Sequence, residues 1–143
     1  MIDPNTGEIC LPSAGIRVGP CLTREQFLAS PLASQCKELV RNEPYVSFAL
    51  PKASFDVHTF VCILWFGGSV LQRVSVQSDA PEFGMSWADW SEEREFARKR
   101  FHEVLLDSIL GRGWSRRRYP WGKVESCYDQ KGGSSSIIVT YGA

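Results

Sequence analysis

The last segment of the chain, WGKVESCYDQKGGSSSIIVTYGA at residues 121–143, predicts a β-hairpin that closes the fold. Asp129 opens a turn-forming run that contains Gly132 and Gly133, and the strong strand formers IIVTY follow at 137–141. A phosphate-binding loop also contains such glycines, but a helix normally follows them there, whereas a strand is expected here. The glycine run therefore indicates a hairpin turn rather than a ligand cradle.

Working outward, the segment FVCILWF at 60–66 is apolar on both sides of an extended chain. This pattern predicts a central strand covered on one face by a helix and on the other by a loop or a partner. Gly67 and Gly68 join it to the run at 69–77 as a tight antiparallel hairpin. Two short helical turns are expected within residues 23–40. The full set of predicted strands lies near residues 8–18, 45–50, 58–66, 69–77, 122–128 and 135–141.

The best helix of the chain is predicted at residues 91–110. Asp89 and Glu92 have capping-box spacing at its start, and Gly111 stands where a C-terminal cap belongs. Projection at about 100° per residue gives an apolar stripe that should dock on the sheet. The stripe comprises Ala97, Phe101, Val104, Leu105 and Ser108. A second, smaller patch on the opposite side either tucks under neighbouring loops or forms a partner surface. This patch comprises Phe96, Leu106 and Leu110.

Together these elements predict an α+β fold with two layers, in which one long helix packs on one face of a mainly antiparallel sheet. The length of 143 residues, of which 43% are hydrophobic, fits a single domain over residues 1–143. The 16 basic residues balance the 16 acidic ones, so the whole-chain charge indicates neither nucleic-acid binding nor strong self-repulsion. Any electrostatic argument must therefore be local.

The five cysteines are scattered without CxxC spacing, which argues against a disulfide framework and against a zinc site. A link between Cys10 and Cys21 across the first hairpin is the alternative. The first residues lack a basic segment followed by a long apolar one, so no secretory signal is expected in the chain as given. The apolar run at 60–66 is too short to span a bilayer. The sequence thus predicts a cytoplasmic protein that uses no membrane, metal or cofactor.

The usual catalytic signatures are missing from the sequence. It contains no GxSxG elbow, no GxxxxGK[ST] loop, no GxGxxG after a strand and no HExxH. His58 opens a strand, and His102 projects to the flank of the docking stripe, where a surface or boundary position is expected. No catalytic residue is therefore predicted. The enzymatic alternative keeps Cys127 as a nucleophile, with His58 or His102 as its base.

The charge of the chain changes sign at the start of the long helix. Residues 79–93 contain five acidic side chains and no basic one, whereas residues 94–118 contain eight basic side chains and three acidic ones. Part of this swing complements the helix dipole. The remainder exceeds that need, and it marks two candidate binding segments.

The first candidate segment, residues 112–121, combines four arginines with three aromatic rings. Its members are Arg112, Trp114, Arg116, Arg117, Arg118, Tyr119 and Trp121. Such a mixture can stack on bases and bind phosphates, can anchor in a protein partner, or can fold its rings back onto the core. The second candidate, the acidic loop at 79–90, offers Glu82, Phe83 and Trp87 to a partner. Its aromatic rings can alternatively cap the core.

Two parts of the sequence resemble a known group of proteins. They are the pattern WGxVxSxYDxKGGxSSIxVxY at 121–141 and the segment GIRVGPCLTREQFLASPL at 15–32. They are similar to a loose group of small bacterial proteins, some of which look like immunity proteins of secreted toxin systems. The resemblance implies a cytoplasmic, single-domain protein that works by binding, and it carries over no catalytic set.

Three functional hypotheses follow from the residues and this resemblance. The first is a protein-binding module that neutralises a bacterial toxin domain by stoichiometric binding, through the charged and aromatic loops. The second is nucleic-acid binding by residues 112–121. The third is an enzyme with a site at Cys127 and a histidine.

Overall fold

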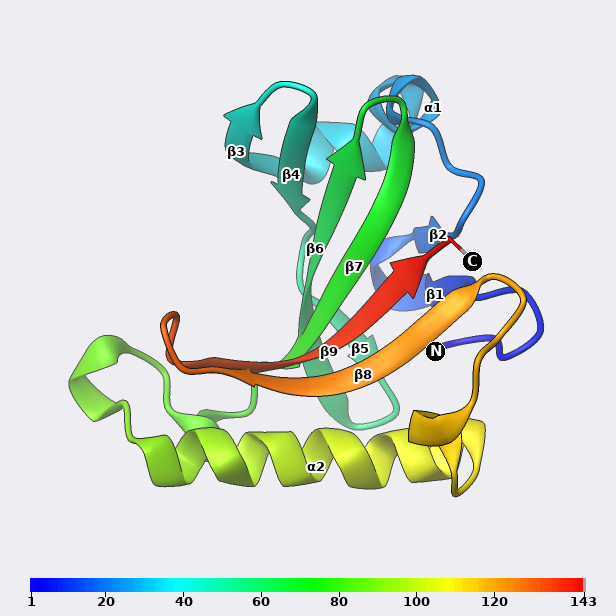
Figure 1. Ribbon diagram of the computed structural model, residues 1–143. Coiled ribbons are helices and arrows are strands. Elements are labelled where there is room, and N and C mark those ends of the chain that lie inside the picture. The colour runs from blue at the N-terminus through cyan, green and yellow to red at the C-terminus, as the bar shows by residue number, and fades with distance from the viewer. Residues whose placement is uncertain (143) are drawn as a thin grey trace.

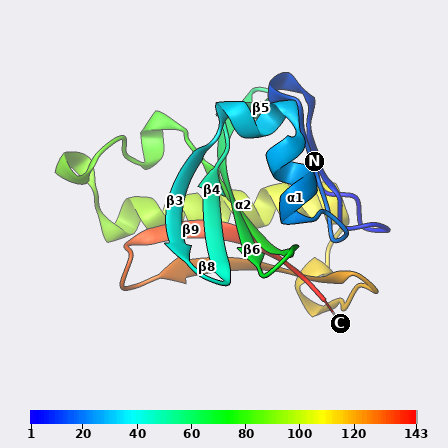
Figure 2. The same cartoon turned by 90° about the horizontal axis from the view of Figure 1, so that it is seen from above.

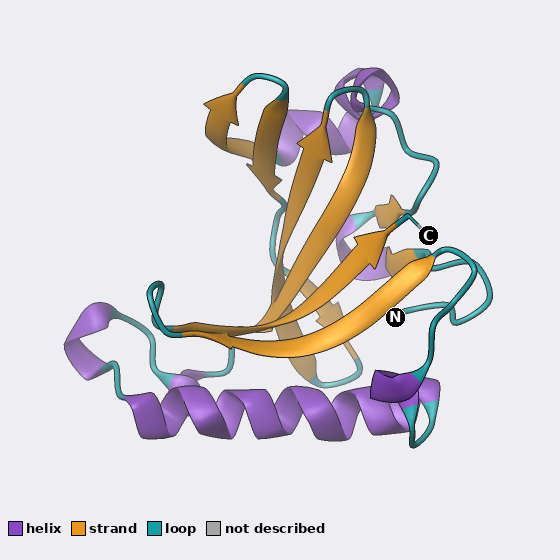
Figure 3. Cartoon of the chain, viewed as in Figure 1, coloured by secondary structure: helices purple, strands orange, loops and turns teal. Residues whose placement is uncertain are grey.

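The computed structural model describes residues 1–142. Its strands are β1 (Ile9–Leu11), β2 (Ile16–Val18), β3 (Lys37–Asn42), β4 (Tyr45–Ala49), β5 (Ala53–Phe55), β6 (His58–Gly67), β7 (Val70–Ser78), β8 (Gly122–Asp129) and β9 (Ser134–Tyr141). Its helices are α1 (Arg24–Ala29) and α2 (Glu92–Leu110), and short 3-10 turns lie between these elements. Figure 1 shows their arrangement, and Figure 3 shows how helices and strands share the chain.

Seven strands form one antiparallel sheet in the order β3-β4-β6-β7-β9-β8, and β5 pairs with the first residues of β6. The register places one row of side chains across β6, β7, β9 and β8, namely Leu64, Val74, Val139 and Val124. All four are buried, which defines the core face of the sheet. The predicted α+β class, with a large antiparallel sheet and one long helix, is confirmed.

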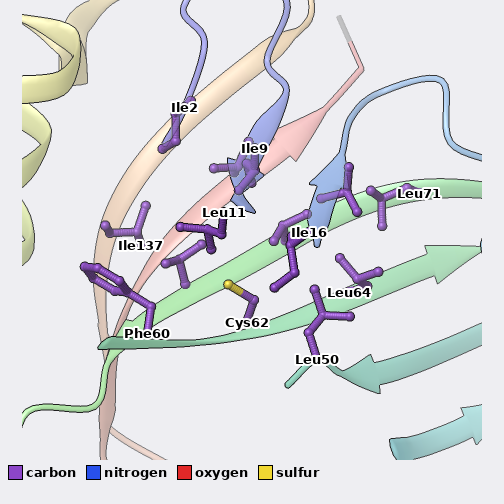
Figure 4. Packing of buried hydrophobic residues seen from close by; sticks show 14 of the residues in the cluster. Ile2, Ile9, Leu11, Ile16, Leu50, Phe60, Cys62, Leu64, Leu71 and Ile137 are labelled. Atoms are coloured by element: carbon purple, nitrogen blue, oxygen red, sulfur yellow. The ribbon is translucent and has the colours of Figure 1, made fainter. Parts of the chain in front are cut away.

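The core lies between this face and the elements that cover it. Figure 1 shows α2 running beneath β8 and β9, and Figure 2 shows α1 and the N-terminal segment beside the other end of the sheet. In Figure 4, Ile9, Leu11 and Ile16 of the small β1–β2 sheet lie over the strands of the main sheet, with Ile16 beside Cys62 and Leu64 of β6. One hydrophobic cluster therefore joins the first strands of the chain to the central hairpin.

Two side-chain hydrogen bonds join the start of the chain to its final hairpin. The indole Nε1 of Trp121 donates to the carbonyl oxygen of Pro4 at 2.9 Å. The hydroxyl of Tyr141 donates to the carbonyl oxygen of Gly7 at 2.7 Å, and burial raises the pKa of this phenol. These contacts fix the N-terminal segment on the closing strands.

Two parts of the strand prediction were wrong. Residues 8–18 form the separate sheet β1–β2, because strands of only three residues pack their buried side chains on the face of the main sheet instead of extending it. Residues 37–40, expected within the helical region, belong to the edge strand β3. All of its side chains are exposed, so no periodic burial marks this strand in the sequence, and pairing with β4 provides its backbone partners.

The ends of the helices follow local capping rules. The predicted helical turns include α1, where Thr23 accepts from the backbone N–H of Gln26 at 3.0 Å and the Gln26 side chain accepts from Thr23 at 3.0 Å. Helix α2 begins one residue later than predicted, and its cap is Ser91 rather than Asp89. Asp89 instead accepts hydrogen bonds from two backbone N–H groups of the preceding loop. Gly111 ends the helix with a φ of 81°, as predicted.

The face of α2 that docks on the sheet overlaps the predicted stripe only at Leu105, which is buried, and at Phe101, which is half-buried against the core. Its buried residues are Glu95, Arg98, His102, Leu105, Leu106 and Leu110. Val104 of the predicted stripe is 67% exposed, and Phe96 of the predicted second patch packs edge-on against Tyr128. The projection failed because it counts only apolar residues, whereas half of the buried face is polar and hydrogen-bonded.

Candidate functional site

The face of the sheet opposite the core carries a row of half-buried and exposed side chains. The same register that buries Leu64 places Ile63, Ser75, Ile138 and Glu125 in this row across β6, β7, β9 and β8. Both helices pack on the core face, since Phe27 of α1 contacts Phe48 and Phe66, and α2 joins the core cluster. We call the opposite side, with Trp65, Arg73 and Gln77, the open face.

Three adjacent hollows lie along the open face, and we call them together the groove. One hollow of about 480 Å³ and a second of about 400 Å³ share Trp65 and Arg73 in their walls. The second shares Gln77 and Ser134 with a third hollow of about 430 Å³ beside the acidic loop. The guanidinium carbon of Arg73 lies 4.8 Å from the centre of the Trp65 ring, so the cation covers the aromatic wall. The groove is therefore lined by both apolar and polar groups.

The acidic loop at 79–90 forms the far wall of the third hollow. Phe83 is buried, whereas Met85 and Trp87 are 78% and 76% exposed. The rings of Trp87 and Trp90 lie 6.2 Å apart, and the Trp90 indole N–H donates to the carbonyl oxygen of Gly133 at 2.7 Å. A large apolar surface thus stands in solvent on a loop that is tied to the β8–β9 turn.

A buried ion pair forms the floor of the third hollow. Nη1 of Arg98 lies 2.8 Å from both carboxylate oxygens of Glu95. The backbone N–H of Ser135 donates to the same carboxylate at 2.9 Å, and Nη2 of Arg98 donates to the carbonyl oxygen of Phe83 at 3.2 Å. Because charges cost much free energy to bury unless they are paired, this network fixes the loop, α2 and β9 relative to one another.

The β8–β9 turn is a structural turn, as its sequence predicted. The backbone N–H of Gly133 donates to the carbonyl oxygen of Asp129 at 2.7 Å, and β9 follows directly. Gly133 has a φ of 67°, and a Cβ atom there would lie 3.2 Å from Nε1 of Trp90 and 3.4 Å from the Trp87 ring. The glycine therefore lets the two tryptophans approach the backbone.

The aromatic rings of residues 112–121 fold back onto the core. Trp114 and Trp121 are 6% and 8% exposed, and the Trp114 indole N–H donates to Asp107 at 2.9 Å. Tyr119 stacks on Trp121 with ring centroids 4.8 Å apart. The charged side chains of the segment, Arg112, Arg116, Arg117 and Arg118, are all exposed. Trp114 and Trp121 thus hold the loop in place and are not available to stack on bases, whereas Tyr119 is half-buried with one ring face covered by Trp121.

The two predicted binding segments lie at opposite ends of α2 (Figure 1). A helix of 19 residues is about 28 Å long, so Glu82, Phe83 and Trp87 are separated from the arginines by that order of distance. Of the three, Glu82 and Trp87 are exposed and Phe83 is buried. The structure brings the acidic loop together with the open face, not with residues 112–121.

His102 lies in the core, so the predicted surface or boundary position is wrong. Its Nε2 accepts a hydrogen bond from the backbone N–H of Ser78 at 3.0 Å. Burial, with a further contribution from the charge of Arg98, lowers the pKa of His102 to about 4. The ring is therefore neutral near pH 7 and serves as a hydrogen-bond acceptor between α2 and β7.

The enzymatic alternative lacks a matching arrangement. Cys127 lies on the open face beside Ser136 and Asp129, and burial raises the pKa of its thiol, which disfavours the nucleophilic thiolate. His102 faces the core, and the ring of His58 packs edge-on against Phe101 at 4.8 Å. Within residues 1–142, no hydrogen bond joins a cysteine to a histidine.

Sequence reasoning missed most of the groove. Ile63, Trp65 and Arg73 were not singled out, although the two-sided apolar pattern at 60–66 indicated that something covers the second face of this strand. Their partners on β9 lie far away in sequence, so only the strand order reveals the groove. The buried pair Glu95 and Arg98 carried no signal beyond its spacing of three residues.

Comparison with models of protein families, with curated proteins and with solved structures gave no match. Across residues 1–142, no helix is both long and apolar enough to cross a membrane. The same residues contain no cluster of three or more histidine, cysteine or acidic side chains that could hold a metal ion. All five cysteines are free, including Cys10 and Cys21.

Proposed function

We propose that this chain is a stoichiometric binding protein, and that its partner is a protein that docks along the groove of the open face and onto the acidic loop. The observation that carries the proposal is that the exposed side chains of Trp87 and Met85 line the hollow that adjoins the open face at Gln77 and Ser134. Protein interfaces are dominated by a few aromatic and arginine side chains that become buried on binding. Trp65, Arg73 and Trp87 supply such groups along one surface.

The charge around the groove favours a partner that is basic at one end. Asp79 pairs with Lys52 and Asp89 pairs with Arg94, so these two acids are largely neutralised. No ion pair within the described residues involves the remaining acids of this region, Glu82, Glu92 and Glu93. A basic partner surface would therefore be steered to Glu82 and the first turn of α2, and its association rate would fall with added salt.

The proposed partner is a bacterial toxin domain, which this chain neutralises in the cytoplasm by forming the complex. The resemblance of residues 15–32 and 121–141 to proteins that look like immunity proteins supports this identity. The absence of an assembled nucleophile and base around Cys127 is consistent with action by binding.

The test begins with co-purification of the tagged chain from its native host and with reconstitution of the complex from purified components. Trp87→Ala should weaken the reconstituted complex by at least about tenfold, since interface hot spots contribute roughly 2 kcal/mol or more. Ile63→Arg should also weaken it, because the new charge would lie in the wall of the groove. Val104→Ala, on the exposed side of α2, is the matched control and should leave the affinity unchanged.

Protection of cells against a toxin encoded beside the chain tests the second part of the proposal. Expression of the wild type should restore growth, and Trp87→Ala should restore it less well at equal protein levels. A host complex that survives both groove variants would refute the docking surface. A groove-dependent partner without toxic activity would refute the toxin assignment alone.

A further inference from the structure

A basic hollow lies at the C-terminal end of α2, and it shares only Thr140 with the walls of the groove. It has a volume of about 440 Å³, and its wall is formed by residues 115–119 on one side and by the start of β8 on the other. The charged side chains that line it are Arg116, Arg117, Arg118, Lys123 and Glu125. Four cations and one carboxylate give this lining a net charge of +3.

The positive charge of this hollow is not neutralised by the protein. Lys123 and Glu125 pair with each other at 3.3 Å. Within residues 1–142, no ion pair involves Arg116, Arg117 or Arg118. Arg117 donates to the carbonyl oxygen of Leu110 at 3.1 Å, which accounts for its place at the helix end. Arg116 and Arg118 have no comparable structural use.

The backbone that carries these arginines is held rigidly. Trp114 anchors a 3-10 turn through its hydrogen bond to Asp107, and Trp121 anchors the other end through Pro4. Between them, the backbones of Tyr119 and Gly122 exchange two hydrogen bonds, at 3.0 and 3.1 Å. A ligand would thus meet arginines whose main chain is already ordered, which lowers the entropy cost of binding.

We propose that this hollow binds a small ligand bearing two linked phosphoryl groups, through their oxygens. Each phosphoryl group carries about −1.5 to −2 charges at pH 7, so two of them neutralise the lining. The planar fork of an arginine matches phosphate oxygens with paired hydrogen bonds. The volume lies in the range of about 300–1,000 Å³ that is common for small-molecule sites.

The geometry favours such a ligand over a nucleic-acid strand. Single strands are held by a basic track together with exposed aromatic rings on which successive bases stack. Here Trp114 and Trp121 are buried, and Tyr119 already stacks on Trp121. Tyr119 is the only aromatic residue that lines the hollow, and Trp121 covers one face of its ring, so the hollow offers no series of rings for successive bases.

The test is calorimetric titration of the full chain with inorganic pyrophosphate. Saturable binding to one site is expected in the wild type, weakening as salt is added. The double variant Arg116→Ala/Arg118→Ala should lose about tenfold or more in affinity, because it removes two charged donors. Arg100→Ala removes an exposed arginine elsewhere on α2 and is the matched control, with affinity expected to stay at the wild-type value.

Several results would overturn the site. They are the lack of saturable pyrophosphate binding at low salt, an equal loss of affinity in Arg100→Ala, and tight binding of a single-stranded oligonucleotide that pyrophosphate does not displace. The circular dichroism of each variant shows whether it is folded. Trp87→Ala, which tests the groove, should bind pyrophosphate normally, so failure of this site and failure of the proposed docking surface are distinguishable.

Discussion

The buried imidazole of His102 should make the protein sensitive to mild acid. Protonation would turn Nε2 from an acceptor into a donor that points at the N–H of Ser78, and it would bury a charge near Arg98. The pKa falls from 6.5 to about 4 on folding, so the unfolded chain binds the proton more tightly. Between these two values the folded state therefore loses stability as the pH falls.

The size of this loss follows from the shift in pKa. A difference of one unit corresponds to about 1.36 kcal/mol, so lowering the pKa from 6.5 to about 4 gives a loss of roughly 3 kcal/mol between these pH values. Above pH 6.5 and below pH 4 this histidine adds little further slope. Acidic groups that titrate in the same range add their own slope, so the contribution must be measured as a difference.

The measurement is urea unfolding from pH 7.5 to pH 3.5 for the wild type and for His102→Gln. Glutamine can still accept from Ser78 but cannot be protonated, so its stability should fall by about 3 kcal/mol less over this range. His58→Gln is the matched control and should keep the wild-type profile. NMR titration of the His102 ring should give a pKa near 4. Parallel profiles for the wild type and His102→Gln, or titration near pH 6.5, would refute the reasoning.

Three further predictions are tested by urea unfolding. Glu95→Ala should destabilise the fold by about 3–5 kcal/mol, because it leaves the Arg98 charge buried without its partner. The double variant Glu95→Ala/Arg98→Ala should lose less free energy of unfolding than the sum of the losses in the two single variants. Gly133→Ala should cost about 1–2 kcal/mol, since alanine disfavours a φ of 67°, and no loss would contradict the turn geometry. Leu106→Ala should lower the free energy of unfolding by about 2–5 kcal/mol, and Val104→Ala should lower it by less than about 0.5 kcal/mol. A larger loss for Val104→Ala than for Leu106→Ala would show that α2 docks through the apolar stripe predicted from the sequence.

The parts of the fold that short-range chemistry determines could be predicted from the sequence. Gly68 turns the central hairpin and Gly133 turns the last one, because these positive φ angles depend on the residue at the turn itself, whereas Gly67 ends β6 as a paired strand residue. The N-cap of α2 depends on the same kind of local hydrogen bond, in which the Ser91 hydroxyl accepts from the backbone N–H of Arg94. Asp89 is also a suitable N-cap residue, which is why the sequence alone pointed to the wrong position.

The rest depends on partners that are distant in sequence. Glu95 is buried because Ser135 lies opposite it, and His102 is buried because Ser78 supplies a donor. Neither partner is visible in a helical projection, which therefore selects Val104 for the core instead. The groove was missed for the same reason, since Ile63 and Ile138 line one hollow only after β7 has been placed between β6 and β9.

The position of β9 between β7 and β8 has a consequence for synthesis of the chain. A ribosome releases the central hairpin long before residues 134–141, so β7 waits with one edge unpaired while more than fifty residues are added. This edge carries Val74 and Val76, which makes it a template for pairing with another chain. The nascent protein is therefore prone to aggregate through this edge until β9 has been synthesised and pairs with β7.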